Sequence, residues 1–150
     1  MSPTTRNRVE VLHGVNLDQL GRRDPAIYGD YNLTELEHRV RGWARELGLD
    51  VRFFQSNHEG ELIEHLHRLP ETADAIVINA GAWTHYSWAL RDALEFTGMP
   101  AVEVHISDVQ AREQWRQFSV FDGVVLDAIS GKGQDGYREA LLRLARELGV

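Results

Sequence analysis

The stretch Ala75-Ile76-Val77-Ile78 decides the fold class of this 150-residue chain. A short, wholly apolar run is typical of a central strand that is buried on both faces of a sheet. An amphipathic helix is expected before it, over Glu61–Leu69 and ended by Pro70, and another after it, over Thr84–Thr97. A buried strand between two helices predicts a parallel sheet with helices on both faces.

The same alternation extends along the rest of the chain. Four more strands are expected, over Arg8–Leu12, Val51–Gln55, Ala101–His105 and Gly123–Leu126, with helices over Leu33–Gly48 and Gly136–Leu148. Asn32 and Glu35 have capping-box spacing at the start of the first of these helices. Five strands separated by helices in a chain this short favour an α/β, flavodoxin-like parallel sheet in the order 2-1-3-4-5.

Length and composition predict a single domain, residues 1–150, that begins with a polar lead-in at residues 1–7. The chain has no cysteine, which excludes disulfides and thiolate chemistry. A net charge of −7 argues against nucleic acid or an anionic membrane as partner. No apolar run reaches the roughly 18 residues of a membrane span, and the N-terminus lacks a signal-like apolar segment, so a cytoplasmic location is expected.

Three polar clusters follow the first, third and fourth predicted strands. They are His13 to Asn16, Asn79 to His85, and Glu103 to Ser107. In the predicted order these strands are neighbours, and open α/β sheets bind ligands beyond the carboxyl ends of their strands. The three clusters are therefore expected to share one crevice.

The third cluster contains a candidate acid–base pair. Glu103 and His105 are two positions apart on a strand, so their side chains share a face. A carboxylate fixes the tautomer of a histidine and favours its protonated form, which suits a proton donor. Arg112 and Arg116 follow with helical spacing and could clamp a small carboxylate. The alternative is a structural ion-pair cluster at the sheet edge.

The connection Leu17–Asp30 is unusually long for a crossover loop, which is typical of a lid; a solvated surface insertion is the alternative. Arg23 and Tyr28 would lie close together if Pro25 bends it. A phenol ionises only in alkaline water, so a tyrosine base needs cationic neighbours.

Other site classes find no support in the sequence. The chain has no P-loop, GxGxxG or GxSxG motif, and no metal-ligand spacing, so neither a metal nor a cofactor is predicted. His38, His65 and His67 are predicted to face solvent from helices. His85, beside the crevice, is a candidate hydrogen-bond donor to a ligand.

Four ordered segments along almost the whole chain resemble the type II 3-dehydroquinate dehydratases. These are Asn16–Gly29, Gln55–Gly60, Ile78–Ala93 and Glu103–Arg116. The resemblance implies a flavodoxin-like subunit assembled as trimers that pack into a homododecamer. It also implies a cofactor-free lyase of the shikimate or quinate pathway, which dehydrates 3-dehydroquinate, a small polyhydroxy carboxylate, to 3-dehydroshikimate through an enolate.

The resemblance also implies roles in proton transfer. Tyr28 would be the base, as a phenolate stabilised by Arg23, with Arg112 as a possible helper. His105, oriented by Glu103, would protonate the departing hydroxyl.

Further residues would bind the reactant. Asn16 would hold a water molecule that stabilises the enolate oxygen, and Asp92 would enter the site from a neighbouring subunit. The remaining substrate-binding residues implied are Asn79, His85, Ile106 (through its backbone), Ser107, Arg112 and Arg116.

Some positions depart from the family pattern. His13 and Val15 replace a usual asparagine and proline, and Asp108 replaces an asparagine. Trp88 could narrow the pocket or thicken the trimer interface. These changes leave open a paralog that dehydrates a modified relative, for example an amino-substituted dehydroquinate, and a catalytically silent scaffold. The sequence also leaves open whether the role is biosynthetic or catabolic.

Overall fold

Strand β3 (Ala75–Asn79) is buried at every position and lies at the centre of a five-stranded parallel sheet. In this computed structural model, which describes residues 5–150, the strand order is β2-β1-β3-β4-β5. The predicted flavodoxin-like order is confirmed; the first four residues of the predicted lead-in lie outside the described residues. The other strands are β1 (Arg8–His13), β2 (Asp50–Gln55), β4 (Ala101–His105) and β5 (Asp127–Ser130).

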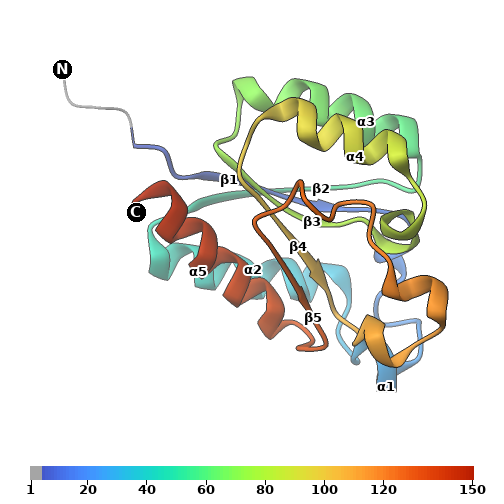
Figure 1. Cartoon of the computed structure of the whole chain (residues 1–150). Coiled ribbons are helices and arrows are strands. Elements are labelled where there is room, and N and C mark those ends of the chain that lie inside the picture. The colour runs from blue at the N-terminus through green and yellow to red at the C-terminus, as the bar shows by residue number, and fades with distance from the viewer. Residues whose placement is uncertain (1–4) are drawn as a thin grey trace.

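Helices cover both faces of the sheet (Figure 1). Helices α2 (Leu33–Leu47) and α5 (Asp135–Leu148) lie on one face, and α3 (Glu59–Arg68) and α4 (Trp88–Thr97) on the other. Strand β3 divides its side chains between two cores: Val77 packs with α2 and α5, whereas its neighbours Ile76 and Ile78 pack with α3 and α4. Burial on both faces explains why this strand has no polar alternation.

The predicted capping box of α2 is confirmed. The Asn32 side chain accepts a hydrogen bond from the Glu35 amide at 2.8 Å, and the Glu35 carboxylate accepts one from the Asn32 amide at 3.4 Å. The helix ends at Gly48, whose φ of 74° is the left-handed conformation that glycine adopts without a steric penalty.

The predicted fifth strand was wrong in position. Gly123–Leu126 forms turns, and Val124 and Val125 pack against the core beneath α3 and α4. Strand β5 begins immediately after the predicted segment, at Asp127, and pairs with β4 only. An edge strand needs few buried residues, and of its four side chains only that of Ile129 is buried.

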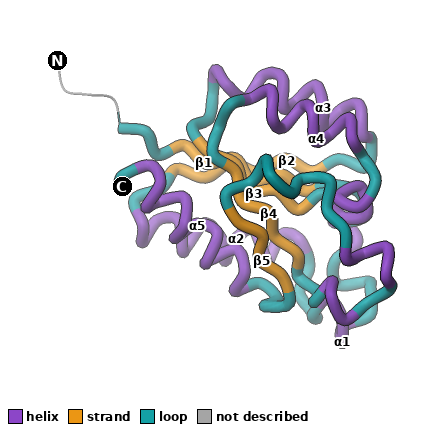
Figure 2. Tube along the Cα trace, in the orientation of Figure 1, coloured by secondary structure: helices purple, strands orange, loops and turns teal. Residues whose placement is uncertain are grey.

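The loops that follow β1, β3 and β4 contain short helical turns (Figure 2). The predicted helix Thr84–Thr97 is divided: a 3-10 turn ends at His85, and Ser87 caps α4 by accepting from the Leu90 amide at 3.1 Å. The short elements are η1 (Leu17–Gln19), α1 (Pro25–Tyr28), η2 (Leu69–Glu71), η3 (Gly81–His85), η4 (Val109–Ala111) and η5 (Gln114–Gln117). Arg112 and Arg116 do not share a helix, although their spacing suggested one: Arg112 follows η4 and Arg116 lies in η5.

The prediction that His65 faces solvent was wrong. Its Nε2 lies 2.7 Å from a carboxylate oxygen of Glu10, a buried residue of β1, and its ring stacks on Phe54 with the centroids 3.8 Å apart. His38 and His67 are exposed, as predicted. Within residues 5–150, none of the helices has the length and apolar character needed to cross a membrane.

Candidate active site

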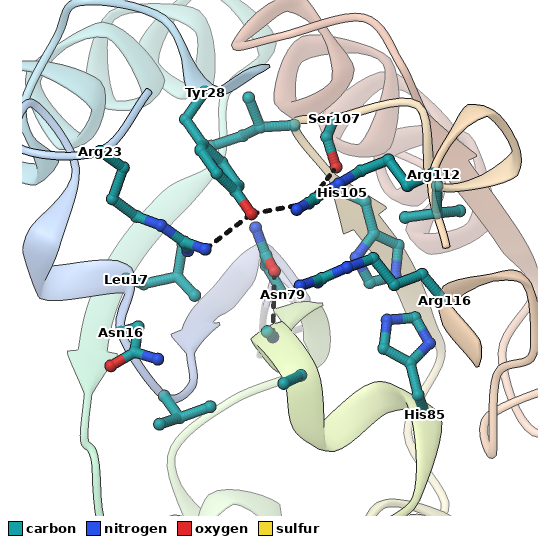
Figure 3. A pocket seen from close by; sticks show the side chains of 15 residues that line it. Asn16, Leu17, Arg23, Tyr28, Asn79, His85, His105, Ser107, Arg112 and Arg116 are labelled. Atoms are coloured by element: carbon teal, nitrogen blue, oxygen red, sulfur yellow. Dashed lines mark hydrogen bonds between the residues drawn. The ribbon is translucent and has the colours of Figure 1, made fainter. Parts of the chain in front are cut away.

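The three polar clusters converge on one pocket of about 100 Å³ at the carboxyl ends of β1, β3 and β4. This convergence was predicted from strand order alone. Figure 3 shows side chains from distant parts of the chain pointing into the same space. The lining residues are Val15, Asn16, Leu17, Arg23, Tyr28, Asn79, Gly81, Ala82, His85, His105, Ile106, Ser107, Val109, Arg112 and Arg116.

Tyr28 lies between two guanidinium groups (Figure 3). Its Oη accepts hydrogen bonds from Arg23 Nη2 at 2.7 Å and from Arg112 Nη1 at 2.6 Å, and the Arg23 guanidinium also lies over its ring, 3.8 Å from the centroid. Asp24 caps the single turn of α1 by accepting from the Ala26 amide at 3.0 Å, and Pro25 begins it, so Tyr28 is held at the end of a bent connection. Two guanidinium groups therefore donate to one phenol oxygen from opposite segments of the chain.

The Glu103–His105 pair exists as predicted. Glu103 Oε2 lies 2.6 Å from His105 Nε2, and both side chains are buried. The other carboxylate oxygen accepts a hydrogen bond from Ser119 Oγ at 2.8 Å. Because Nε2 faces the carboxylate, the other ring nitrogen of His105, Nδ1, is the one free to act in the pocket that this residue lines.

His85 is oriented as an acceptor rather than the donor that the sequence predicted. Its Nδ1 donates to the Phe118 carbonyl oxygen at 2.6 Å, which leaves Nε2 for a ligand. Burial lowers the pKa of His85, and the charges of His105 and Arg116 lower it further. The hydrogen bond to the Phe118 carbonyl raises the pKa but does not outweigh these effects. A neutral ring that donates through Nδ1 can only accept at Nε2.

Arg116 extends into the pocket beside His85 (Figure 3). Its Nε donates to Glu113, and this ion pair lowers the pKa of the Glu113 carboxyl. Arg112 Nη1 also contacts Ser107 Oγ, at 3.3 Å. The two arginines thus occupy one side of the pocket, which suits an anionic ligand.

The floor of the pocket is formed by the ends of β1 and β3. Asn16 has a left-handed backbone (φ 69°), and its amide donates to Asn57 Oδ1 at 2.8 Å. A Cβ on Gly14 would lie 2.3 Å from the Ala80 carbonyl oxygen, so glycine is required for the two loops to approach this closely. The Asn79 carboxamide lies between the Gly81 amide, at 3.2 Å, and a buried tyrosine hydroxyl.

Several residues that the sequence emphasised do not line the pocket. Glu103 and His13 are buried but absent from its lining. Asp92 is exposed on α4. Asp108 is exposed, and its carboxylate accepts from the Gln110 amide at 3.1 Å. Trp88 is 57% exposed and packs near Phe118, so it does not narrow the cavity.

Sequence reasoning missed three residues that support the site. Ser119 holds Glu103, Asn57 holds the Asn16 backbone, and Tyr137 holds Asn79. Asn57 lies in a segment that carries the family resemblance. No sequence pattern pointed to Ser119 or Tyr137 as part of the site. Ser119 lies in an irregular loop, and Tyr137 belongs to the apolar stripe of the last helix.

Comparison with known proteins gives the family. The family model described as dehydroquinase class II matches residues 7–145. The chain belongs to this family. A relative from Syntrophotalea carbinolica, called 3-dehydroquinate dehydratase, is 49% identical over 144 residues, which cover 95% of this chain and 97% of the relative. Another of the same name, from Desulforudis audaxviator, is 50% identical over 94% of this chain and 93% of its own length.

Solved structures of class II dehydroquinases agree with this fold. The crystal structure of a type II dehydroquinase from Propionibacterium acnes superposes with a TM-score of 0.90 at 40% identity, covering 96% of this chain and 99% of that chain. Among residues 5–150, no three or more histidine, aspartate or glutamate side chains are grouped to hold a metal ion. The pocket of this class II dehydroquinase is lined by the Tyr28 phenol, two imidazoles and three guanidinium groups.

Proposed function

We propose that this class II dehydroquinase dehydrates 3-dehydroquinate to 3-dehydroshikimate by a cofactor-free elimination through an enolate. The observation that carries the proposal is one pocket lined by both a phenol with two guanidinium donors and a histidine with a buried carboxylate partner. The first arrangement suits a base and the second an acid, as an elimination of water requires.

Tyr28 is the proposed base. Removal of the proton alpha to the ketone needs a strong base, and Arg23 and Arg112 stabilise the phenolate charge. Negative charge then passes from the phenolate to the enolate oxygen. Asn16, which lines the pocket, is the proposed holder of a water molecule that hydrogen-bonds to that oxygen.

His105 is the proposed acid. Its proton passes to the departing hydroxyl group, so the carbon–oxygen bond breaks as water forms and the enolate collapses to the conjugated enone. Glu103 stabilises the imidazolium that this step consumes and, with both oxygens engaged, holds the ring in place. Tyr28 ends the cycle protonated and His105 deprotonated, and exchange with solvent restores both.

The remaining lining residues are the proposed substrate contacts. Arg116 and Arg112 are cationic partners for the carboxylate. His85 Nε2 is an acceptor for a hydroxyl, and Ser107, the Ile106 backbone and Asn79 offer further hydrogen bonds.

Assembly into trimers that pack as a dodecamer is part of the proposal. Trp88, Asp92 and Phe96 are spaced four residues apart, so they share one face of α4, and all three are exposed. Phe96 is 82% exposed and Trp88 57%, and two large apolar side chains on one exposed face suit an interface. Covering this face with a neighbouring subunit would bury Phe96 and bring Asp92 towards the neighbour's pocket.

The test of the activity is direct. Purified protein is mixed with 3-dehydroquinate, and the ultraviolet absorbance of the conjugated enone is recorded. We expect the absorbance to rise with protein concentration; no rise at millimolar substrate would overturn the proposed function.

A complementation experiment tests the shared site. Tyr28→Phe and Asp92→Asn should each be inactive alone. If a site takes Tyr28 from one chain and Asp92 from another, mixed oligomers contain some intact sites, and activity should return after the two variants are dissociated and reassembled together. An Asp92→Asn variant with full activity would remove Asp92 from the site.

A further inference from the structure

A buried hydrogen-bonded cluster lies beneath the pocket and has no part in the mechanism above. It consists of His13 at the end of β1, Asn79 at the end of β3 and Tyr137 on α5, of which only Asn79 reaches the pocket. His13 and Tyr137 are fully buried, and Asn79 is 4% exposed. His13 and Asn79 are register partners in the sheet, so their side chains lie next to each other.

The protons in this cluster can be assigned. Tyr137 Oη lies 2.9 Å from His13 Nε2 and 3.1 Å from Asn79 Nδ2. Burial raises the pKa of Tyr137, so its hydroxyl keeps its proton, and burial lowers the pKa of His13 to about 4, so its ring is neutral at neutral pH. Tyr137 therefore donates to His13 Nε2 and accepts from Asn79, which completes a chain of two hydrogen bonds.

The opposite tautomer of His13 is less favourable. With the proton on Nε2, His13 and Asn79 would both donate to Tyr137, and the tyrosine hydroxyl would have nothing to donate to. The assigned tautomer leaves one unmatched group, the His13 Nδ1 proton, which has no partner among residues 5–150. A buried donor without an acceptor is costly, so this group lowers the stability of the folded protein.

The Gly81 amide fixes which way round the Asn79 carboxamide lies, and Tyr137 holds its other end. Its Oδ1 accepts from the Gly81 amide at 3.2 Å, while Nδ2 donates to Tyr137. A flipped carboxamide would place two N–H groups against each other at Gly81. The orientation present leaves the second Nδ2 proton and one Oδ1 lone pair for a ligand.

We propose that His13 and Tyr137 are positioning residues, which hold the Asn79 carboxamide in the orientation that a hydroxylated ligand meets. The proposal rests on the proposed function for the identity of that ligand, but the positioning itself is a property of the apoprotein. Neither residue touches the pocket, so both act through Asn79.

Steady-state kinetics with 3-dehydroquinate tests the proposal. Tyr137→Phe should raise KM about tenfold, the effect of one lost hydrogen bond, with a much smaller change in kcat. In an Asn79→Ala background, Tyr137→Phe should have no further effect on kcat/KM. An undiminished effect in that background would overturn the proposal, because Tyr137 would then act by another route.

Tyr31→Phe is the matched control. Tyr31 Oη is also buried, but it has no hydrogen-bond partner among the described residues. Loss of this hydroxyl should leave KM unchanged. A tenfold increase in KM in this variant as well would mean that any buried hydroxyl deletion disturbs the site, and the assignment to Tyr137 would fail.

A pair of variants at His13 tests the other end of the chain. His13→Gln keeps an oxygen that can accept from Tyr137, whereas His13→Leu removes the acceptor. We expect His13→Gln to have a KM near that of the wild type and His13→Leu to resemble Tyr137→Phe. Equal KM values for the two variants would show that the acceptor does not matter.

Crystal structures of the wild type and of Tyr137→Phe separate this inference from the proposed function. The Asn79 side chain should change rotamer or split between two in the variant. If the wild type fails to dehydrate 3-dehydroquinate but Asn79 moves in the variant, the proposed function is wrong and the positioning role stands. An unchanged Asn79 in an active enzyme would overturn the positioning role alone.

Discussion

Arg112 Nη1 lies 2.6 Å from Tyr28 Oη, although the two residues are 84 positions apart in the chain. Arg112 comes from the loop after β4 and Tyr28 from the connection after β1. Their contact joins a loop beside the candidate acid to the segment that carries the candidate base. It also places Arg112 beside the candidate base, in the helper position that the family resemblance implied in addition to substrate binding.

Replacement of Tyr28 by phenylalanine should nearly abolish turnover. Loss of the base removes a proton-transfer contribution of about 10²- to 10⁴-fold in kcat. Enone absorbance measures the rate, and Tyr31→Phe, three residues further on, is the control that should stay active. Activity within tenfold of the wild type would identify another group as the base.

Arg23→Gln should lower kcat/KM by about tenfold or more. The variant loses a charge-assisted hydrogen bond to the Tyr28 oxygen and the cation that lies over the Tyr28 ring. The adjacent Arg22 is exposed and bonds only to the nearby Gln19 among the described residues, so Arg22→Gln should keep the wild-type kcat/KM. Equal kcat/KM values for both variants would contradict the role of Arg23.

Ser119→Ala should lower kcat by about tenfold, as one hydrogen bond to a charged group is lost. The Glu103 carboxylate would then be held by His105 alone. KM should change little, because Ser119 does not line the pocket. An increase in KM with unchanged kcat would indicate that Ser119 affects binding instead.

Stability should fall as the pH drops from 6.5 to about 4. Burial lowers the pKa of His13 from 6.5 to about 4. Between these two pH values the imidazole is protonated in the unfolded chain and neutral in the folded protein, so acid favours unfolding. The loss amounts to about 3 kcal/mol and is complete below the folded-state value. Melting temperatures at fixed protein concentration should fall less steeply with acid in His13→Gln. His38→Gln, at an exposed position, should keep the wild-type slope.

Asp108→Asn should leave KM and kcat within about twofold of the wild type. The Asp108 side chain caps a turn outside the pocket, and asparagine can accept the same hydrogen bond from Gln110. Kinetics with 3-dehydroquinate checks this. A large improvement in KM would revive the interpretation that Asp108 selects a modified substrate.

Much of the fold was predictable because its strongest signals are local. Ala75–Ile78 is apolar at every position, and the capping box of α2 needs only two residues at fixed spacing. Strand β5 was misplaced because an edge strand has little hydrophobic pattern. The preceding Val124 and Val125 are apolar for a different reason: they lie in a turn and pack, partly buried, against the core.

The site was predictable where strand geometry or strand order determines contact. Glu103 and His105 meet because alternate residues share a face, and the clusters of β1, β3 and β4 meet because those strands are neighbours. Contacts that depend on irregular backbone were not predictable. Ser119 reaches Glu103 from a loop with no periodic pattern, and the direction in which His85 donates depends on the Phe118 carbonyl.

The position of Tyr28 between two arginines also bears on how the site opens. Arg23 belongs to the same connection as Tyr28, whereas Arg112 comes from the loop after β4, so the Tyr28–Arg112 bond ties the connection to a second, distant segment. Because a guanidinium group is always charged, this hydrogen bond is charge-assisted and about twice as strong as a neutral one. A movement that carried Tyr28 away from the pocket would have to break it, so the cost of opening the site would include the loss of this one bond.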